Sequence, residues 1–360
     1  MTVSKKSLGP LVRIGSVNAF LLAFAVFSFL AAPVSAADRN GYVVTPLVSD
    51  NGVPGTTVDP NLVNAWGLAA GPTSPWWVAD NHVDLSTLYN AAGAKLGLEV
   101  AVVGGPTGLV FNGVSSAFHI GTASARFIFS TEGGMILGWA PGSTVATAMV
   151  DRSMLGAVYK GLAIAMTGSG PMLYATDFVN GRVDVFDGSW ALTSVPGGFM
   201  DPMMPAGYAP FGIQTIGTRI VVTYGKQVPG STDEAHGQGY GFVNAFDFEG
   251  NLVAHVAQHG QLNAPWGLAW APANFGRFGG DLLVANFADG HINAYAETAN
   301  GHFEYRGYLR MGNGQPVAIS GLWAIEFGNG APNNGPIDTL FFTAGPNDEA
   351  DGLFGTITVA

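Results

Sequence analysis

The sequence predicts an all-β fold, a six-bladed β-propeller with four antiparallel strands in each blade. Three observations support this prediction. A short motif built around one glycine recurs six times along the chain. Each copy is followed by further short apolar runs that have the composition of β-strands. The 360 residues include no cysteine, so packing between repeated units has to stabilise the fold without disulfide bonds.

The recurring motif predicts the innermost strand of each blade. Its copies read "WGLAA", "TGLVF", "KGLAI", "FGIQT", "WGLAW" and "SGLWA", and their glycines are Gly67, Gly108, Gly161, Gly212, Gly267 and Gly321. Neighbouring glycines are 41 to 55 residues apart, a period that suits one four-stranded blade. Six backbones crowd around the axis of such a propeller, and glycine allows them to approach closely.

Two further runs follow each motif and predict the second and third strands. The second runs are "PWWVAD", "RFIFST", "MLYATD", "RIVVTY", "DLLVAN" and "TLFFTA". The third runs are "STLYN", "GMILGWA", "GRVDVFD", "GFVNAFD", "GHINAYA" and "GLFGTITV". Most are rich in β-branched or aromatic residues and are bounded by Gly, Asn or Asp, as short strands are. Weaker fourth runs such as "LVAHVAQ" and "YRGYLRM" complete most units.

The sixth unit lacks a fourth strand of its own, because the sequence reaches Ala360 with the third run. Residues 41–49, "GYVVTPLVS", are strand-like and belong to none of the six units. We expect this N-terminal segment to pair outside the last third strand. That pairing would close the ring and remove an open sheet edge.

The start of the chain is typical of a signal peptide. Three basic residues precede an apolar run over residues 17–32, and Val34 and Ala36 are the small residues before a cleavage site. An uncleaved membrane anchor is the alternative, but the run is short for a membrane span. We therefore predict a signal peptide over residues 1–36 and a single propeller domain over residues 37–360. This predicts a periplasmic or extracellular protein that is not inserted in a membrane after cleavage.

The charge balance limits the class of partner. The chain carries 25 acidic and 14 basic residues, a formal net charge of -11. An acidic surface repels nucleic acid and anionic membranes and permits cations. We expect a monomer whose partner is a small molecule or another component of the envelope or medium.

Six stretches of the sequence carry a family resemblance: "NAWGLAAGP", "GAVYKGLAIA", "DFVNGRVDVFD", "PAGYAPFGIQ", "LNAPWGLAWAPANFG" and "LFFTAGPNDEADGLFG". With them the chain resembles an uncharacterised family of exported bacterial proteins, six-bladed β-propellers similar to NHL-type repeats. The resemblance extends over nearly all of the chain after the signal peptide. It implies the fold and export, and it implies no particular activity.

Propeller geometry brings two sets of loops to one face, where they surround a mouth of the axial channel. The residues before the motif glycines form the first ring: Trp66, Thr107, Lys160, Phe211, Trp266 and Ser320. The ends of the second strands form the other: Asp80, Glu132, Asp177, Tyr224, Asn286 and Asn347. From these rings we select as candidate ligand-binding residues Trp66, Lys160, Phe211, Tyr224, Trp266 and Asn347.

The same face is predicted to be strongly acidic. Ten of the 25 acidic residues fall in its loops: Asp80, Asp84, Glu132, Asp177, Asp233, Glu234, Asp289, Asp348, Glu349 and Asp351. Oxygen ligands of this kind suit Ca²⁺ or another divalent cation, the one cofactor that the sequence suggests. The candidate metal ligands are Asp80, Glu132, Asp177 and Asn286, since similar-looking six-bladed hydrolases hold a metal on the axis. The alternative is that these are ordinary turn residues, because Asp and Asn favour turns.

Two functional hypotheses follow, and the sequence leaves open whether the protein is an enzyme. The first is an exported binding or interaction protein with an acidic axial ligand site. The second is a divalent-metal-dependent hydrolase or lyase of the lactonase type, with Asp177 as general base. Lys160 is either an ion-pair partner or a group that binds an anionic substrate or acts as a base. Trp66, Trp266 and Trp323 are expected to belong mainly to the core.

Overall fold

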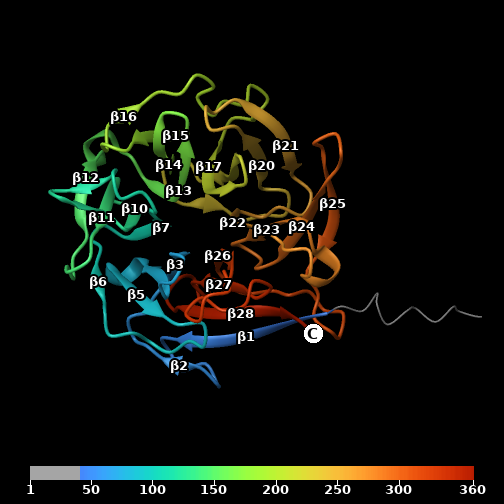
Figure 1. Ribbon diagram of the computed structural model, residues 1–360. Coiled ribbons are helices and arrows are strands. Elements are labelled where there is room, and N and C mark those ends of the chain that lie inside the picture. Colours follow the sequence, from blue (N-terminus) through green and yellow to red (C-terminus); the bar gives the residue numbers. More distant parts are fainter. Residues whose placement is uncertain (1–40) are drawn as a thin grey trace, which may run out of the picture. The chain divides into compact units, whose positions relative to one another are not determined.

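The structure is a computed structural model that describes residues 41–360. The predicted signal peptide, residues 1–36, lies outside the described residues. Within the described range no helix is long and apolar enough to span a membrane. Short strands dominate this range, and six sheets of them follow one another around a ring (Figure 1).

The first three sheets follow the chain from its first motif glycine. Sheet one contains β3 (Ala65–Ala70), β4 (Trp76–Asp80), β5 (Leu85–Tyr89) and β6 (Val100–Ala101). Sheet two contains β7 (Pro106–Phe111), β10 (Phe127–Thr131), β11 (Met135–Trp139) and β12 (Thr147–Asp151). Sheet three contains β13 (Tyr159–Thr167), β14 (Gly170–Asp177), β15 (Arg182–Asp187) and β16 (Leu192–Thr193). A separate hairpin pairs β8 (His119–Ile120) with β9 (Ala123–Ser124).

The last three sheets complete the ring. Sheet four contains β17 (Tyr208–Ile216), β18 (Arg219–Gln227), β20 (Phe242–Phe246) and β21 (Leu252–Gln258), with β19 (Glu234–Ala235) paired to β18. Sheet five contains β22 (Pro265–Trp270), β23 (Leu282–Asn286), β24 (Ile292–Glu297) and β25 (Phe303–Tyr308). Sheet six contains β26 (Leu322–Phe327), β27 (Leu340–Ala344), β28 (Leu353–Val359), β1 (Tyr42–Ser49) and β2 (Thr57–Val58). In residues 41–360, three short 3-10 helices lie in connections: η2 (Asn81–Val83), η3 (Ser153–Leu155) and η4 (Gly276–Phe278).

The six-bladed propeller predicted from the repeat is therefore confirmed. Closure by the N-terminal strand is confirmed as well, because β1 pairs antiparallel with β28, from Tyr42 opposite Val359 to Ser49 opposite Leu353. Sheet six is larger than predicted, since β2 adds a fifth strand parallel to β1. Pro46, which has no N–H to donate, sits at the bulge in β1.

The first five motif glycines lie where the innermost strands of neighbouring blades touch. A Cβ built on Gly67 would lie 2.2 Å from the carbonyl oxygen of Thr107, and one on Gly212 would lie 2.1 Å from that of Trp266. Both oxygens belong to the next blade. Any side chain at these positions would push two backbones apart, which is the crowding that the repeat predicted.

The sixth motif was misaligned in the sequence prediction. In blade six Leu322 pairs with Ala344 and a bulge follows, as Ala65 pairs with Asp80 before a bulge in blade one. This register makes Ala324 the equivalent of the motif glycine and Trp323 the residue before it. Gly321 and Ser320 precede the strand instead, and Gly321 has a positive φ of 65°.

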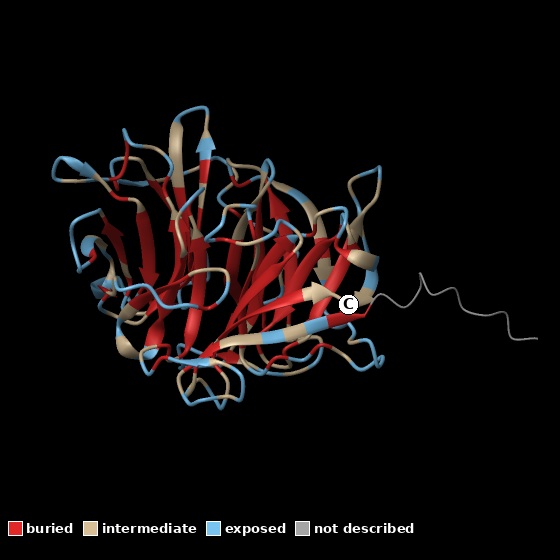
Figure 2. Ribbon diagram, turned by 60° about the horizontal axis from the view of Figure 1, so that its bottom comes forward, coloured by how far each residue is buried: buried red, intermediate tan, exposed pale blue. Residues whose placement is uncertain are grey.

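The core runs between the blades, because each sheet packs both of its faces against its neighbours. Figure 2 shows buried residues along the strands and exposed ones in the connecting loops. Between blades one and two, for example, Trp77 stacks on Phe127 with ring centroids 4.1 Å apart. Trp77 and Phe127 are both buried, and aromatic side chains of this size contribute strongly to core stability.

Candidate functional site

One end of the axis is closed by aromatic side chains. Trp66 stacks on Trp323 with ring centroids 3.7 Å apart, and Phe287 stacks on Trp323 at 3.9 Å. Trp266 and Phe211 meet the edge of Trp323, each with ring centroids 5.9 Å away. We call these five side chains the aromatic plug. They come from blades one, four, five and six, so the plug spans the axis.

Lys160 packs its ammonium group against this plug. Its Nζ lies 5.1 Å from the centroid of the Trp66 ring, and its side chain is only 2% exposed. Nζ donates a hydrogen bond of 2.6 Å to Oε1 of Glu132 and lies 3.9 Å from Oδ1 of Asp233. Burial alone would lower the pKa of Lys160, but the charges of Glu132, Glu234 and Asp233 outweigh it and raise the pKa.

A chain of amides joins Glu132 to a second carboxylate. Asn81 donates from Nδ2 to Oε2 of Glu132 at 3.0 Å. Asn64 donates from Nδ2 to Oδ1 of Asn81 at 3.2 Å and to Oε2 of Glu349 at 2.6 Å. Its own Oδ1 accepts a 2.9 Å hydrogen bond from Nε1 of Trp323. Asn64 therefore uses both amide hydrogens and its oxygen, and it fixes the carboxylate of Glu349 relative to the plug.

The loop that carries Glu349 has an unusual backbone. Asn347, Asp348 and Glu349 all have positive φ, at 56°, 51° and 65°. Each left-handed non-glycine residue costs conformational free energy, and such residues gather at functional sites. Burial and the charge of Glu234 raise the pKa of Glu349 to about 7, against the opposing effects of Lys160 and Asn64.

Glu234, His236 and His82 are further ionisable side chains near Lys160 and Glu349. The Glu234 side chain is 5% exposed, and its Oε1 lies 3.6 Å from Nε2 of His236. This pairing raises the pKa of His236 above its ordinary value. His82 lies near Glu349, with its Nε2 3.9 Å from Oε2 of that carboxylate. We call Glu132, Lys160, Asp233, Glu234 and Glu349 the acidic mouth.

The structure brings together some of the site residues that the sequence predicted. Lys160 and Glu132 form an ion pair, and Trp66, Phe211 and Trp266 all belong to the aromatic plug. Trp323 is buried in the core, as the sequence predicted. It also holds the position in the first ring that the prediction assigned to Ser320. Asn347 lies exposed in the left-handed loop beside Glu349.

The other candidates point away from this group. Asp80 is buried and accepts a hydrogen bond from the backbone N–H of Thr87 at 2.8 Å. Burial raises the pKa of Asp80 well above its usual range. Tyr224 is 4% exposed and packs in the core between blades three and four. Its phenol lies toward Asn244 on the third strand of its own blade.

Asp177 and Asn286 also bond to residues near their own strands rather than to Lys160 or Glu132. Asp177 accepts a 3.2 Å hydrogen bond from the backbone N–H of Val158 and lies 3.1 Å from the guanidinium of Arg182. Asn286 donates from Nδ2 to the carbonyl of Gln261 at 2.8 Å. In residues 41–360 no group of three or more His, Asp or Glu is placed to hold a metal ion. The four candidate metal ligands are thus not gathered around one point.

Beneath the aromatic plug the axis narrows to an aliphatic ring. Its members, one from each blade, are Leu68, Leu109, Leu162, Ile213, Leu268 and Ile325. Past this ring a cavity of about 200 Å³ opens at the opposite end of the axis. Glu326 lines that cavity, and burial raises its pKa to about 8. The aromatic plug and the aliphatic ring therefore lie between the acidic side chains and this cavity.

Comparison with known proteins adds relatives but no activity. No protein-family model matches the chain. Uncharacterized protein R648 of Acanthamoeba polyphaga mimivirus is 31% identical over 329 residues, which cover 86% of this chain and 78% of that protein. Uncharacterized protein L690 of the same virus is 29% identical over 338 residues, covering 87% of this chain and 85% of that one. These viral relatives do not support the bacterial, exported origin that the resemblance implied.

Among solved structures, one titled "Streptogramin B lyase structure" is similar to this chain. It matches with a TM-score of 0.53 and 10% identity, and the match covers 91% of this chain and 100% of that chain. A likeness at this identity shows the propeller fold alone.

Proposed function

The chain belongs to the family of the mimivirus protein R648, whose name gives no activity, and from the site itself we propose a propeller-type binding protein that takes a small organic cation at the acidic mouth. The ligand class is one with an ammonium or guanidinium group. Export to the periplasm or the medium stays a prediction.

The excess of acid over base around Lys160 supports this proposal. Four carboxylates of the acidic mouth, including Asp233 and Glu234, face a single buried ammonium. Burial and like charges both disfavour ionisation: burial is the main cause of the raised pKa of Glu349, and the charge of Glu234 adds to it. A second cation would balance the charge and let Glu349 ionise.

The surroundings favour an organic cation. Lys160 already lies over the face of Trp66, and aromatic faces attract ammonium and guanidinium groups. Phe287 and the ring of His236, whose centroids are 5.5 Å apart, border the mouth beside Glu234. The plug and the aliphatic ring close the axis below, so the site suits a small molecule that stays at the mouth.

The test measures thermal stability at pH 7.5 with 1,4-diaminobutane and with succinate at equal ionic strength. Bound ligand stabilises the native state, so the diamine should raise Tm while succinate does not. Glu349→Gln should reduce the diamine effect. Glu304→Gln, which removes an exposed carboxylate on the outer strand β25, is the matched control and should keep it. If the diamine leaves Tm unchanged, or both variants lose the effect equally, the cation site is refuted.

The metal-dependent hydrolase or lyase stays the alternative proposal. It needs Asp80, Glu132, Asp177 and Asn286 to converge, and their contacts in the structure lead to separate partners. Elemental analysis of the purified protein tests it. A stoichiometric divalent ion that is lost in Asp177→Ala would favour the alternative over the organic-cation site.

A further inference from the structure

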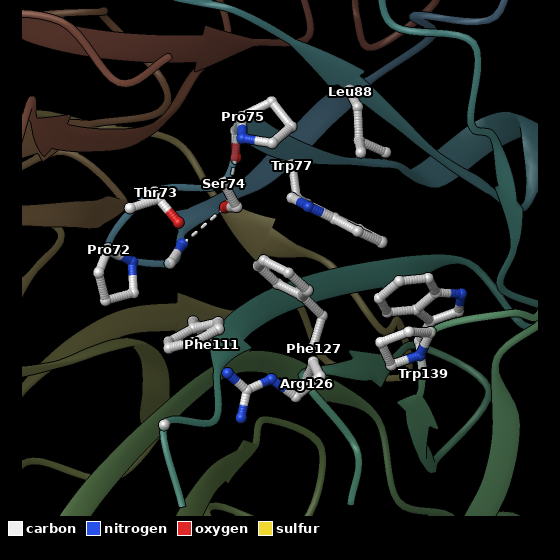
Figure 3. A pocket seen from close by; sticks show the side chains of 13 residues that line it. Pro72, Thr73, Ser74, Pro75, Trp77, Leu88, Phe111, Arg126, Phe127 and Trp139 are labelled. Atoms are coloured by element: carbon white, nitrogen blue, oxygen red, sulfur yellow. Dashed lines mark hydrogen bonds between the residues drawn. The ribbon is translucent and has the colours of Figure 1, made fainter. Parts of the chain in front are cut away.

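A second pocket lies at the opposite ends of the inner strands from the acidic mouth. It has a volume of about 460 Å³ and opens between the β3–β4 hairpin, residues 71–75, and blade two. Figure 3 shows its side chains. They are mostly apolar and include four aromatic rings, with one charged group: Trp77, Leu88, Phe111, Phe127, Trp139 and Arg126, beside the prolines Pro72, Pro75 and Pro141.

The aromatic wall of this pocket is rigid. Trp77 stacks on Phe127 at 4.1 Å and contacts Trp139 at 4.6 Å, both between ring centroids. Phe111 meets the edge of Phe127 at 5.4 Å. Trp77, Phe127 and Trp139 are buried, whereas Phe111 is half-buried. Phe111 therefore offers a partly free aromatic surface that is held in place by the rings behind it.

The opposite wall is held by hydrogen bonds to blade six. Within the hairpin, Ser74 Oγ accepts a 2.8 Å hydrogen bond from the backbone N–H of Gly71. Asn334 donates from Nδ2 to the carbonyl of Ser74 at 2.6 Å. A Cβ on Gly71 would lie 2.7 Å from the ring of Phe111, so glycine lets the hairpin approach that ring. A pocket with both walls fixed loses little entropy when a ligand binds.

Arg126 supplies the charge of the pocket. Its guanidinium carbon lies 5.1 Å from the centroid of the Phe111 ring. In residues 41–360 the guanidinium has no carboxylate at salt-bridge distance, which is also true of Arg277, Arg306 and Arg310, whereas Arg152, Arg182 and Arg219 each have one. Among these arginines Arg126 is the one that lines the pocket, and it is the only charged side chain there. Planar guanidinium groups pair with carboxylates through two parallel hydrogen bonds.

We propose that this pocket binds a small planar aromatic carboxylate. The ring of the ligand packs on Phe111 and the proline-rich hairpin, and its carboxylate pairs with Arg126. One arginine matches the single charge of a carboxylate, and the apolar lining matches an aromatic body. The ligand class is opposite in charge to that of the acidic mouth, and the two proposals are independent.

Isothermal titration at pH 7.5 with 2-naphthoate tests the charge requirement. The neutral analogue 2-naphthamide keeps the ring, and acetate keeps the carboxylate. We expect 2-naphthoate to bind at least about tenfold more tightly than either, since a hydrogen bond to a charged group contributes this much. Arg126→Gln should abolish the preference over the amide. Arg277→Gln is the matched control, because Arg277 lies over Phe278 at 5.4 Å, outside the pocket.

A second variant tests the pocket by filling it with a side chain, without removing the charge of Arg126. Gly113 lines the pocket and is exposed, and a Cβ there would meet only Phe111, at 3.7 Å. Gly113→Phe should keep the wild-type Tm and lose 2-naphthoate binding. The proposal is overturned if wild-type protein does not bind 2-naphthoate or binds the amide equally well. It is also overturned if Arg126→Gln or Gly113→Phe binds as the wild type does.

Discussion

At the scale of single residues, Lys160 shows how a buried charge is kept. Its ammonium is desolvated, and its nearest compensation is the 2.6 Å hydrogen bond to Glu132. Removing one member of a buried pair costs about 3–5 kcal/mol because the other charge is left uncompensated. Glu132 is 30% exposed, and Asp233 and Glu234 stay nearby, so the cost here is smaller.

We therefore expect Glu132→Gln to lower the free energy of unfolding by about 1–2 kcal/mol. Adding Lys160→Met should recover part of this loss, because the methionine keeps the apolar stem over Trp66 and removes the unpaired charge. Urea denaturation of both variants measures the coupling. Equal stability of Glu132→Gln and wild type would show that the pair carries no stabilising energy.

The raised pKa of Glu349 makes the free energy of unfolding depend on pH, and the sign of this dependence can be worked out. Its pKa is raised from the ordinary value of 4.5 to about 7 in the folded protein. The folded state then binds more protons than the unfolded state between these values, so this residue makes stability fall as pH rises through the window. The raised pKa corresponds to at most about 3 kcal/mol, and water reaching the 30%-exposed side chain reduces this.

Glu349→Gln should remove that decline. Relative to wild type, the variant should gain stability between pH 5 and 7.5, by roughly 1–2 kcal/mol after the reduction for solvent. Chemical denaturation across this pH range measures the difference, in which other titrating groups largely cancel. A difference that is constant with pH would mean that Glu349 titrates at its ordinary pKa.

At the scale of strands, the innermost strands depend on backbone contact at the glycine. Gly212→Ala would place a methyl group 2.1 Å from the carbonyl oxygen of Trp266, which belongs to the next blade and cannot rotate away. We expect a loss of about 2–4 kcal/mol in the free energy of unfolding. Gly168→Ala is the control, because a Cβ there meets nothing within 4 Å. Thermal unfolding compares the two, and equal Tm values would contradict the crowding argument.

The sequence predicted the blades because this contact imposes a glycine at a regular interval. It misplaced the sixth copy because Ala324 holds the equivalent position and Gly321 lies three residues earlier. The sequence also identified Lys160, which directly precedes a motif glycine, and Glu132, which directly follows the end of a second strand. It could not tell that Asp80 and Asp177 turn toward their own blades, because one residue of register decides the face on which a strand residue lies.

The sequence did not predict that Asn64 and Asn81 belong to the site, for a different reason. Asn64 and Asn81 act by joining Glu132 to Glu349 across blades that are distant in the chain. One signal for Asn64 was present, since "NAWG" and "NAPWG" both place an asparagine just before the innermost strand. The left-handed loop over residues 347–349 left no such signal, because it contains no glycine at those positions.

At the scale of the whole propeller, closure depends on β1. This strand covers the edge of β28 along seven residue pairs, and it buries Tyr42 and Val48. Without it, β28 would present a row of unpaired backbone groups, an edge that promotes association between chains. The ring would also lose the seven residue pairs that join the N-terminal strand to the last sheet.

We expect a chain that begins at residue 60 to self-associate, as measured by size-exclusion chromatography with light scattering, whereas one that begins at residue 41 stays monomeric. A synthetic peptide of residues 41–58 should restore the monomer and raise Tm, because it can add β1 and β2 back to the free edge. A scrambled peptide of the same composition should do neither. Monomeric, fully stable protein without residues 41–59 would show that the five remaining blades and the three-stranded sixth sheet close the ring unaided.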